Sequence, residues 1–239
     1  MTIHLNESIR GLPFFCSWSG GKDSCLALHH AIRGGGEPRA LLTMLAEDGR
    51  TSRSHALPRM LVEAQASRLG LPAVFRPASW QRYEAEFSSA LQEFRKSGIK
   101  VGVFGDIDVE AHREWVNRVC RAAGIMPVLP LWQRDRRELL KEFFDLGYSA
   151  RIIVLNERLL DKRFLGRTLE STTCEELEKA GVDPCGELGE YHTVVTGGPV
   201  FSSNIEIKTA GREYHDGYWF LKVIPLDCRP DSLGQAGGT

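Results

Sequence analysis

The residues with the clearest chemical potential lie near the start of the chain, in Ser19-Gly20-Gly21-Lys22-Asp23-Ser24. An apolar run precedes this segment and a helical pattern follows it, so we expect a loop between a strand and a helix. Adjacent glycines let a backbone turn sharply and approach a ligand closely. The hydroxyls, the lysine and the unpaired N–H groups of a helix N-terminus together favour binding of a phosphate. We call residues 17–24 the phosphate loop.

The spacing within this loop distinguishes it from other nucleotide-binding loops. A Walker loop has four residues between its glycines, whereas here the glycines are adjacent and Asp23 separates Lys22 from Ser24. Ser-Gly-Gly-Lys-Asp-Ser resembles the pyrophosphate loop of ATP pyrophosphatases, which split ATP between its α- and β-phosphates. The alternative is a surface turn rich in glycine and serine.

A second chemically suggestive segment is Gly186-Glu-Leu-Gly-Glu-Tyr-His-Thr193. Glu187 and Glu190 lie three positions apart on a glycine-rich loop, where carboxylates can bind Mg²⁺, orient an amine or act as a base. His192 can carry a proton near neutral pH. The alternative is an acidic turn in solvent that leads into a hairpin. We call residues 183–190 the acidic loop.

Between these two segments, short apolar runs alternate with helical patterns. Strands are expected at 13–16, 40–45, 73–77, 101–104, 126–131 and 150–155, with helices between them. That alternation predicts an α/β fold with a Rossmann-like, doubly wound parallel sheet and helices on both of its faces. We therefore predict an ATP-binding domain at 12–155, a smaller substrate-side α+β domain at 156–228, and a flexible tail at 229–239.

Polar side chains follow several of the predicted strands. In a doubly wound sheet, ligands bind beyond the carboxyl ends of the strands. The phosphate loop, the loop with Arg53 and His55, and the turn with Asp106 and Asp108 each follow a strand. We expect all of them at one rim, with Arg53 and His55 as candidates to anchor a phosphate or an anionic substrate. For these two residues an ordinary exposed loop is the alternative.

The composition limits the class of protein. The chain has 239 residues, 42% hydrophobic and 26% charged, with a formal net charge of −1. That balance gives no electrostatic basis for general nucleic-acid or membrane binding, and no apolar run reaches the ~20 residues of a membrane span. The six cysteines form no Cys-x-x-Cys pair. We interpret them as buried free thiols in a cytoplasmic protein.

Five motifs occur in one order along the chain. They are Ser19 to Ser24, Phe104-Gly-Asp-Ile107, Cys120…Gly124…Pro130-Leu-Trp132, Phe164-Leu-Gly-Arg167, and Gly186 to Thr193. In this combination the chain, from about Phe14 to Val223, resembles the diphthine–ammonia ligase family, a branch of the adenine-nucleotide α-hydrolase-like superfamily. The resemblance implies an ATP-binding Rossmann-like domain and a smaller substrate-side domain. It also implies ATP-dependent amidation of a carboxylate by ammonium, with release of AMP and pyrophosphate. The family's named substrate is diphthine, a modified histidine of translation elongation factor 2.

The sequence departs from the family pattern in the acidic loop. The family carries Glu-Gly-Gly-Glu-Phe/Tyr-Glu, whereas here Leu188 replaces a glycine and His192 stands at the third carboxylate. The form Glu-x-Gly-Glu-Tyr-His-Thr resembles bacterial members, whose hosts do not make diphthamide; some are linked to cobalamin salvage. ATP use therefore carries over from the family more securely than the acceptor does.

The resemblance and the residue types together suggest roles. The predicted ATP-binding residues are Ser17, Trp18, Ser19, Gly20, Gly21, Lys22, Asp23, Ser24, Met44 and Gly105. The predicted catalytic residues are Lys22, Glu187, Glu190 and His192. The predicted Mg²⁺ ligands are Asp23 and Asp106. Lys22 would stabilise the departing pyrophosphate, and the two glutamates would hold ammonia while His192 or a glutamate takes its proton. Trp18 and Met44 would flank adenine, with core packing as the alternative for Met44. For Asp23 the alternative is an acid favoured by the helix dipole.

The expected partners are a carboxylate substrate, either a small molecule or a modified residue, and ammonia. Two other functions stay open. A tRNA-modifying ATP pyrophosphatase would need a reactive cysteine pair or a basic face, and a non-catalytic nucleotide sensor would bind ATP without forming AMP. The sequence leaves the oligomeric state open, including a homodimer.

Overall fold

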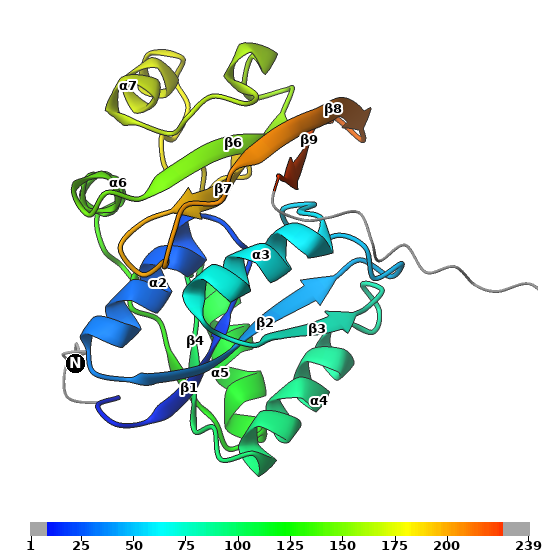
Figure 1. Ribbon diagram of the computed structural model, residues 1–239, viewed down its shortest axis with the longest axis vertical. Helices are drawn as coiled ribbons and strands as arrows, with labels where there is room; N and C mark the ends of the chain where they lie inside the picture. Colours follow the sequence, from blue (N-terminus) through cyan, green and yellow to red (C-terminus); the bar gives the residue numbers. More distant parts are fainter. Residues whose placement is uncertain (1–8, 227–239) are drawn as a thin grey trace, which may run out of the picture.

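The computed structural model describes residues 9–226, which form two β-sheets with helices around them (Figure 1). The predicted tail at 229–239 and Cys228 lie outside the described residues. The other five cysteines are free and buried, which confirms their interpretation as buried thiols. Among the described residues, no helix is long and apolar enough to cross a membrane.

The first sheet has five parallel strands in the order β3-β2-β1-β4-β5. They are β1 (Pro13–Ser17), β2 (Glu37–Leu45), β3 (Ala73–Pro77), β4 (Val101–Val103) and β5 (Met126–Val128). The chain moves outward from β1 in one direction and then returns to place β4 on its other side. This reversal opens a crevice at the carboxyl ends of β1 and β4, where doubly wound sheets bind their ligands.

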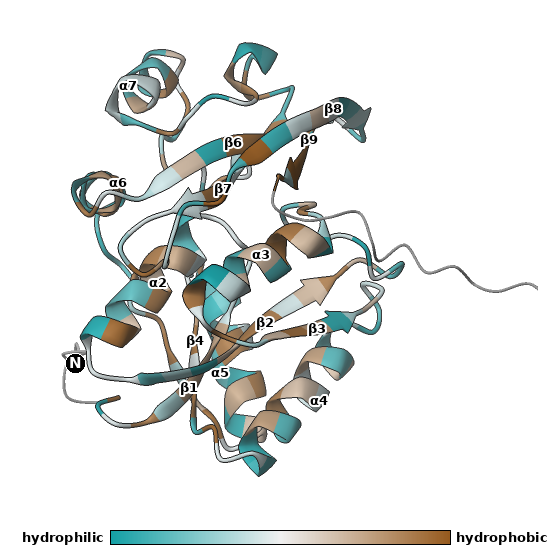
Figure 2. Cartoon of the chain, viewed as in Figure 1, coloured by the Kyte–Doolittle hydropathy of each residue, from teal (hydrophilic) through white to brown (hydrophobic). Residues whose placement is uncertain are grey.

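Helices cover both faces of this sheet, as predicted. They are α2 (Lys22–Arg33), α3 (Arg59–Leu69), α4 (Tyr83–Lys96) and α5 (Glu110–Ala122). Side chains of α2 and α3 join one buried cluster with Phe14 and Cys16 of β1, and those of α4 and α5 join another with Phe15. Successive residues of a strand point to opposite faces, so β1 contributes to both clusters. In Figure 2 these helices carry both hydrophilic and hydrophobic stretches, as amphipathic helices do.

The second sheet is antiparallel, with strand order β7-β6-β9-β8. Its strands are β6 (Ser149–Asn156), β7 (Tyr191–Gly197), β8 (Ile207–His215) and β9 (Tyr218–Pro225); the adjoining helices are α6 (Arg136–Asp145), the 3₁₀ helix η1 (Lys162–Phe164) and α7 (Ser171–Lys179). Asp216 and Gly217 turn the β8–β9 hairpin with φ angles of 51° and 87°. The fold class is therefore confirmed: a Rossmann-like parallel sheet with a smaller α+β part.

One sequence interpretation is wrong. Residues 150–155 were expected to form the sixth strand of the parallel sheet, but β6 lies inside the antiparallel sheet, between β7 and β9. Ala150, Ile152, Ile153, Val154 and Leu155 are all buried, and a strand covered on both faces has the same apolar pattern in either kind of sheet. The domain division after residue 155 stays a prediction.

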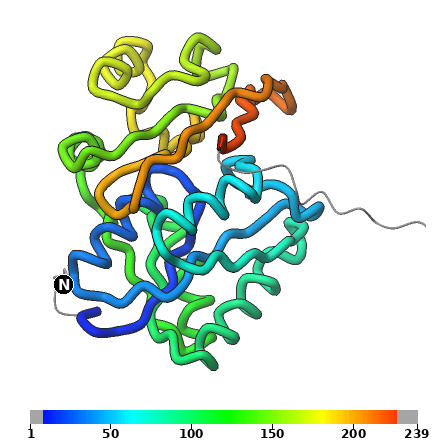
Figure 3. Tube along the Cα trace, in the orientation of Figure 1, coloured from blue at the N-terminus to red at the C-terminus, as the bar shows by residue number. Residues whose placement is uncertain are grey.

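The two sheets share one core. Residues of α2, α3, β6, β7 and β9 belong to the same buried cluster. Figure 3 shows β7, near residue 195, running beside the N-terminal part of the chain that holds α2, and residues of the two elements are in contact. The start of α2, which carries the phosphate loop, therefore meets the second sheet directly.

Candidate functional site

A cavity of about 390 Å³ lies where the carboxyl ends of β1 and β4 meet the start of β7. Its lining consists of Ser17, Ser19, Lys22, Asp23, Ser24, His55, Gly105, Asp106, His112, Gly186, Glu187, Gly189, Tyr191, His192 and Thr193. Segments more than 160 residues apart in sequence thus line one space. We call it the nucleotide cavity. Five residues of the phosphate loop, together with His55 and Asp106, line it, as the predicted common rim requires, whereas Arg53 and Asp108 do not.

The glycines of the phosphate loop fit tight surroundings. Gly20 has a φ of 81°, and a Cβ there would lie 2.4 Å from Leu57 Cδ1. At Gly21 a Cβ would lie 2.4 Å from His55 Cε1. At Gly105, in the turn after β4 that packs against this loop, a Cβ would lie 2.8 Å from the backbone nitrogen of Ser24. Any side chain at these positions would therefore push the loop away from its neighbours.

Hydrogen bonds fix the shape of the loop from within. The Ser24 hydroxyl donates to the Gly21 carbonyl at 3.1 Å, and the Gly21 N–H donates to Ser19 Oγ at 3.3 Å. Ser19 Oγ and Ser24 Oγ lie 3.1 Å apart. The first backbone bond of α2 runs from the Cys25 N–H to Gly21, and Gly21 has no side chain to cap the helix. The N–H groups of Asp23 and Ser24 thus have no intrahelical acceptor, and this geometry suits an anion.

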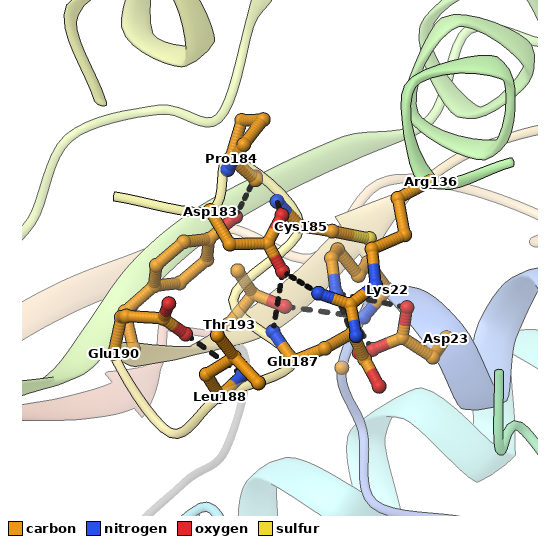
Figure 4. A network of polar contacts seen from close by, with 12 residues as sticks. Lys22, Asp23, Arg136, Asp183, Pro184, Cys185, Glu187, Leu188, Glu190 and Thr193 are labelled. Atoms are coloured by element: carbon orange, nitrogen blue, oxygen red, sulfur yellow. Dashed lines mark hydrogen bonds and ion pairs between the residues drawn. The ribbon is translucent and has the colours of Figure 1, made fainter. Parts of the chain in front are cut away.

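Lys22 is buried and surrounded by acceptors. Its Nζ lies 2.8 Å from both carboxylate oxygens of Asp23 and 3.7 Å from Glu187 Oε1 (Figure 4). Burial lowers the pKa of Lys22, but the charge of Asp23, with smaller effects of other neighbours, outweighs burial and raises the pKa well above its ordinary value. The ammonium is therefore a permanent cation in the cavity, between the phosphate loop and the acidic loop.

The second sheet holds the phosphate loop in place. The Lys22 N–H donates to Thr193 Oγ1 at 3.1 Å, and the Val195 N–H donates to the Gly20 carbonyl at 2.9 Å. Gln65, which is fully buried in α3, donates to the carbonyls of both Gly20 and Val195, at 3.0 and 2.8 Å. A loop and a strand 170 residues apart are thereby fixed to each other.

Sequence reasoning missed Gln65. A signal was present, because Gln65 lies four residues after Leu61 on the face of α3 that is otherwise apolar. A polar side chain at a core position must find hydrogen-bond partners, which marks it as a candidate connector. Gln65 Oε1 also accepts from Trp18 Nε1 at 2.9 Å.

Two predicted adenine contacts lie away from the cavity lining. Trp18 is 2% exposed and its indole N–H is bonded to Gln65. Met44 is buried with Phe15 and Phe87 under the other face of the parallel sheet. Neither residue lines the nucleotide cavity. Their predicted role beside adenine stays untested.

The acidic loop is fixed by a charged residue that the sequence did not suggest. Arg136, the first residue of α6, makes two hydrogen bonds of 2.8 Å to Asp108 and one of 2.5 Å to Asp183. Asp183 in turn accepts the backbone N–H groups of Cys185 at 3.0 Å and Glu187 at 3.2 Å. Figure 4 shows Arg136 beside the loop that carries these residues. This network connects the acidic loop to the turn after β4.

Glu187 and Glu190 occupy different environments, although the sequence suggests a matched pair. Glu187 lines the cavity, and burial together with the charge of Asp23 raises its pKa to about 7. Glu190 is 4% exposed, does not line the cavity, and accepts the Leu188 N–H at 2.9 Å. In Figure 4 its carboxylate lies on the far side of the loop from Lys22. Glu187 can therefore exchange a proton in the cavity, whereas Glu190 braces the turn.

Two histidines stack at one end of the cavity. The rings of His55 and His192 lie 4.6 Å apart with an interplanar angle of 30°. His55 Nδ1 lies 2.8 Å from the Thr193 carbonyl oxygen and therefore donates to it. Burial lowers the pKa of His55 to about 4. Burial, and to a smaller extent repulsion from a charged His55, lowers the pKa of His192 to about 3. Both imidazoles are thus neutral at pH 7.

The remaining predicted residues divide between the cavity and its surroundings. Asp106 lines the cavity and lies 3.2 Å from His112 Nδ1. This contact raises the pKa of His112. Arg53 is not in the lining; its guanidinium donates to the Ala78 carbonyl and lies over the Trp80 ring, 4.4 Å from the centroid.

The comparison with protein families agrees with this architecture. Residues 14–127 match the diphthamide synthase N-terminal domain, and residues 135–225 match the diphthamide synthase C-terminal domain. The chain therefore belongs to the diphthamide synthase family, as the motif order predicted. Whether it is a bacterial-type member stays a prediction.

Individual relatives are similar over most of the chain. A diphthine–ammonia ligase of Rattus norvegicus is 28% identical over 87% of this chain and 87% of its own, and one of Homo sapiens has the same values. A diphthine–ammonia ligase of Schizosaccharomyces pombe is 28% identical over 78% of this chain but 34% of its own. Among solved structures, a predicted subunit of tRNA methyltransferase from Methanocaldococcus jannaschii has a TM-score of 0.44 at 14% identity, covering 79% of this chain and 98% of that one. That likeness is too low to carry an argument.

Proposed function

We propose that this protein is an AMP-forming, ATP-dependent ligase that activates a carboxylate and amidates it with ammonia. One observation carries the proposal: Lys22 Nζ lies within 4 Å of carboxylates from both the phosphate loop and the acidic loop, inside one cavity. The part of the cavity that would bind phosphate and the part that would accept a proton thus share the Lys22 ammonium. The names of the relatives, diphthine–ammonia ligases, fit this chemistry.

The reaction would run in two steps. A carboxylate oxygen of the acceptor attacks the α-phosphorus of ATP, the bond to the β-phosphate oxygen breaks, and pyrophosphate leaves as the acyl-adenylate forms. The N-terminal N–H groups of α2 and Lys22 would stabilise the charge on that leaving group. Ammonia then attacks the acyl carbon and AMP leaves. Glu187, with a pKa raised to about 7, would take the excess proton from the nitrogen.

The donor atoms in the cavity suit Mg²⁺. Ligand atoms of Asp23, Cys185 and Glu187 lie within 4.8 Å of one another. Mg²⁺ takes oxygen ligands, which the Asp23 carboxylate supplies, while Glu187 stays free of the metal to act as the base. The Cys185 thiol does not fit, because burial raises its pKa to about 12 and keeps it protonated. Bound there, Mg²⁺ would neutralise phosphate charge. The predicted ligand Asp106 lines the same cavity.

The raised thiol pKa values also weigh against the tRNA-thiolating alternative. Burial raises the pKa of Cys120 to about 12 and that of Cys174 to about 11, and it raises those of Cys16 and Cys25 as well. A thiolating enzyme needs a nucleophilic thiolate, which these environments disfavour.

The test is the identity of the nucleotide product. Purified protein is incubated with ATP, Mg²⁺, ammonium and a panel of carboxylic acids, and AMP is separated from ADP. We expect AMP and pyrophosphate in equal amounts, and an amide of one of the acids. Formation of ADP, or binding of ATP without hydrolysis across the panel, would contradict the proposal and favour a kinase-like enzyme or a nucleotide sensor.

A matched pair of variants separates the two steps. Glu187→Gln should retain exchange of labelled pyrophosphate into ATP, which reports the first step, while amide formation falls at least about tenfold. Glu190→Gln keeps the side-chain shape outside the cavity and should affect amide formation less. If Glu190→Gln is the more damaging change, the assignment of the base to Glu187 is wrong.

A further inference from the structure

A second cavity, of about 490 Å³, lies on the other side of His55. Its lining consists of Arg50, Thr51, His55, Ala56, Pro58, Ile153, Val154, Ala210, Glu213, His215, Phe220, Leu221, Lys222, Val223 and Ile224. It thus lies between the loop after β2 and the strands β6, β8 and β9. We call it the sheet cavity. Its volume is in the range of small-molecule sites.

The walls of the sheet cavity are mainly apolar. Ile153 and Val154 of β6, and Phe220 and Leu221 of β9, line it at the middle of the antiparallel sheet. Nine of the fifteen lining residues are apolar, and the polar or charged ones are Arg50, Thr51, His55, Glu213, His215 and Lys222. A ligand that fits this space therefore has an apolar body.

The charged groups of the sheet cavity leave one cation available. Lys222 and Glu213 form an ion pair, and His215 Nε2 lies 3.4 Å from Glu213. Arg50 is exposed and, among the described residues, its guanidinium has no ion-pair or hydrogen-bond partner. A guanidinium without a counter-ion at the mouth of an apolar cavity attracts an anion.

The sheet cavity adjoins the nucleotide cavity. His55 lines both, and its ring stacks on His192, which lines the nucleotide cavity only. Val154 of the sheet cavity is paired with His192 across β6 and β7. A molecule in the sheet cavity would therefore place the group that extends past His55 next to the phosphate loop and Glu187.

We propose that the sheet cavity binds the acceptor, and that the acceptor is a small carboxylic acid with an apolar body. The body occupies the space over β6 and β9, and the carboxylate extends past His55 into the nucleotide cavity. Arg50 draws the negatively charged acid to the mouth. This inference rests on the proposed ligase function for the fate of the carboxylate, but the binding site itself can be tested without it.

The test measures binding of three probe acids, octanoate, 4-phenylbutyrate and 3-indolepropionate, to the full chain by isothermal titration calorimetry. Ala210 is exposed on β8 and lines the sheet cavity, so Ala210→Trp fills the space without altering the core. Thr209→Trp is the matched control, because Thr209 is also exposed but does not line the cavity. We expect Ala210→Trp to weaken binding of the best probe at least about tenfold, and Thr209→Trp to change it less than about twofold.

The role of charge is tested with Arg50→Gln. This variant should weaken binding of 4-phenylbutyrate about threefold and leave binding of the uncharged 4-phenylbutyramide unchanged, since only the acid interacts with the guanidinium charge. Equal effects on acid and amide would overturn the part assigned to Arg50.

The remaining outcomes separate this inference from the proposed function. If none of the probes binds saturably, or if both tryptophan variants weaken binding equally, the sheet cavity is not the acceptor site, whatever the nucleotide assay gives. If binding responds as expected but no acid yields AMP, the cavity assignment stands and the ligase function fails. If both hold, Ala210→Trp should raise the KM for the acid and leave the KM for ATP unchanged.

Discussion

The phosphate loop and the acidic loop line the same cavity but reach their shapes by different means. The phosphate loop is closed by bonds among Ser19, Gly21 and Ser24, residues at most five positions apart. The acidic loop depends on Arg136, which lies 47 residues before Asp183. Neighbouring residues thus close the first loop, which β7 and Gln65 then hold in position. The second loop also has local bonds, from Asp183 and Glu190, but a distant guanidinium anchors it.

This difference affects how well each loop of the site can be identified from the sequence. A loop held by its own backbone and hydroxyls can be identified as a motif, because its partners are neighbours in sequence. A loop held by tertiary contacts gives a weaker pattern. The carboxylates of the acidic loop are visible in sequence, but their functions are not: Glu187 faces Lys22 and Glu190 faces a backbone N–H group.

The largest effect is expected from removing the cation that the two loops share. Lys22→Ala should lower ATP-dependent pyrophosphate release about 100-fold or more, because a buried charge aimed at a leaving group stabilises the transition state strongly. A continuous coupled assay for pyrophosphate measures the rate, and circular dichroism checks that the fold is intact. Turnover at the wild-type rate would show that Lys22 does not act on ATP.

Breaking the connection between the phosphate loop and β7 should chiefly reduce stability. Gln65→Leu leaves the Trp18 N–H and the Val195 carbonyl without their bonds to Gln65, at a cost of about 2 to 4 kcal/mol in the free energy of unfolding. Urea denaturation measures this loss. The KM for ATP should also rise, because Gly20 loses one of its two donors. Gln65→Glu, which keeps the length but changes the donor to an acceptor, should be at least as destabilising; a wild-type midpoint in either variant would contradict the connector role.

Loosening the acidic loop should reduce activity more than stability. Arg136→Gln removes the bonds to Asp108 and Asp183, which are partly exposed, so we expect a stability loss of about 1 kcal/mol. Amide formation should fall about tenfold, because misplaced catalytic groups lose orientation. Arg137→Gln, one position further along α6 at an exposed side chain paired with Glu178, is the control. If both variants behave alike, Arg136 does not position the loop.

The smallest effect concerns pH. The folded-state pKa of His192 is lowered to about 3, whereas the unfolded chain titrates near 6.5. Between these values the unfolded state binds the extra proton, so the stability provided by a neutral His192 is present above pH 6.5 and is lost as pH falls. His192→Phe should therefore shift acid unfolding to lower pH, by about half a unit. Acid titration followed by fluorescence measures the midpoint; an unchanged or higher midpoint would mean that His192 does not limit acid stability.

Much of the fold could be predicted because strands and helices have distinct apolar periods. The α4 helix, Tyr83–Lys96, lies between two of the expected strands, and its Phe87, Leu91 and Phe94 recur at helical spacing. The sheet that contains β6 could not be predicted, because burial on both faces erases the alternation that distinguishes sheet types.

The sequence by itself determined the phosphate loop, the alternation of strands and helices, and the family, because each depends on residues close together or on an ordered set of motifs. Only the tertiary structure decided that β7 and Gln65 hold the phosphate loop, that Glu187 and not Glu190 faces Lys22, and that His55 lies between two cavities. These facts depend on which side chains meet across long separations. Packing of the whole chain brings these side chains into contact, and no local pattern of residues encodes those contacts.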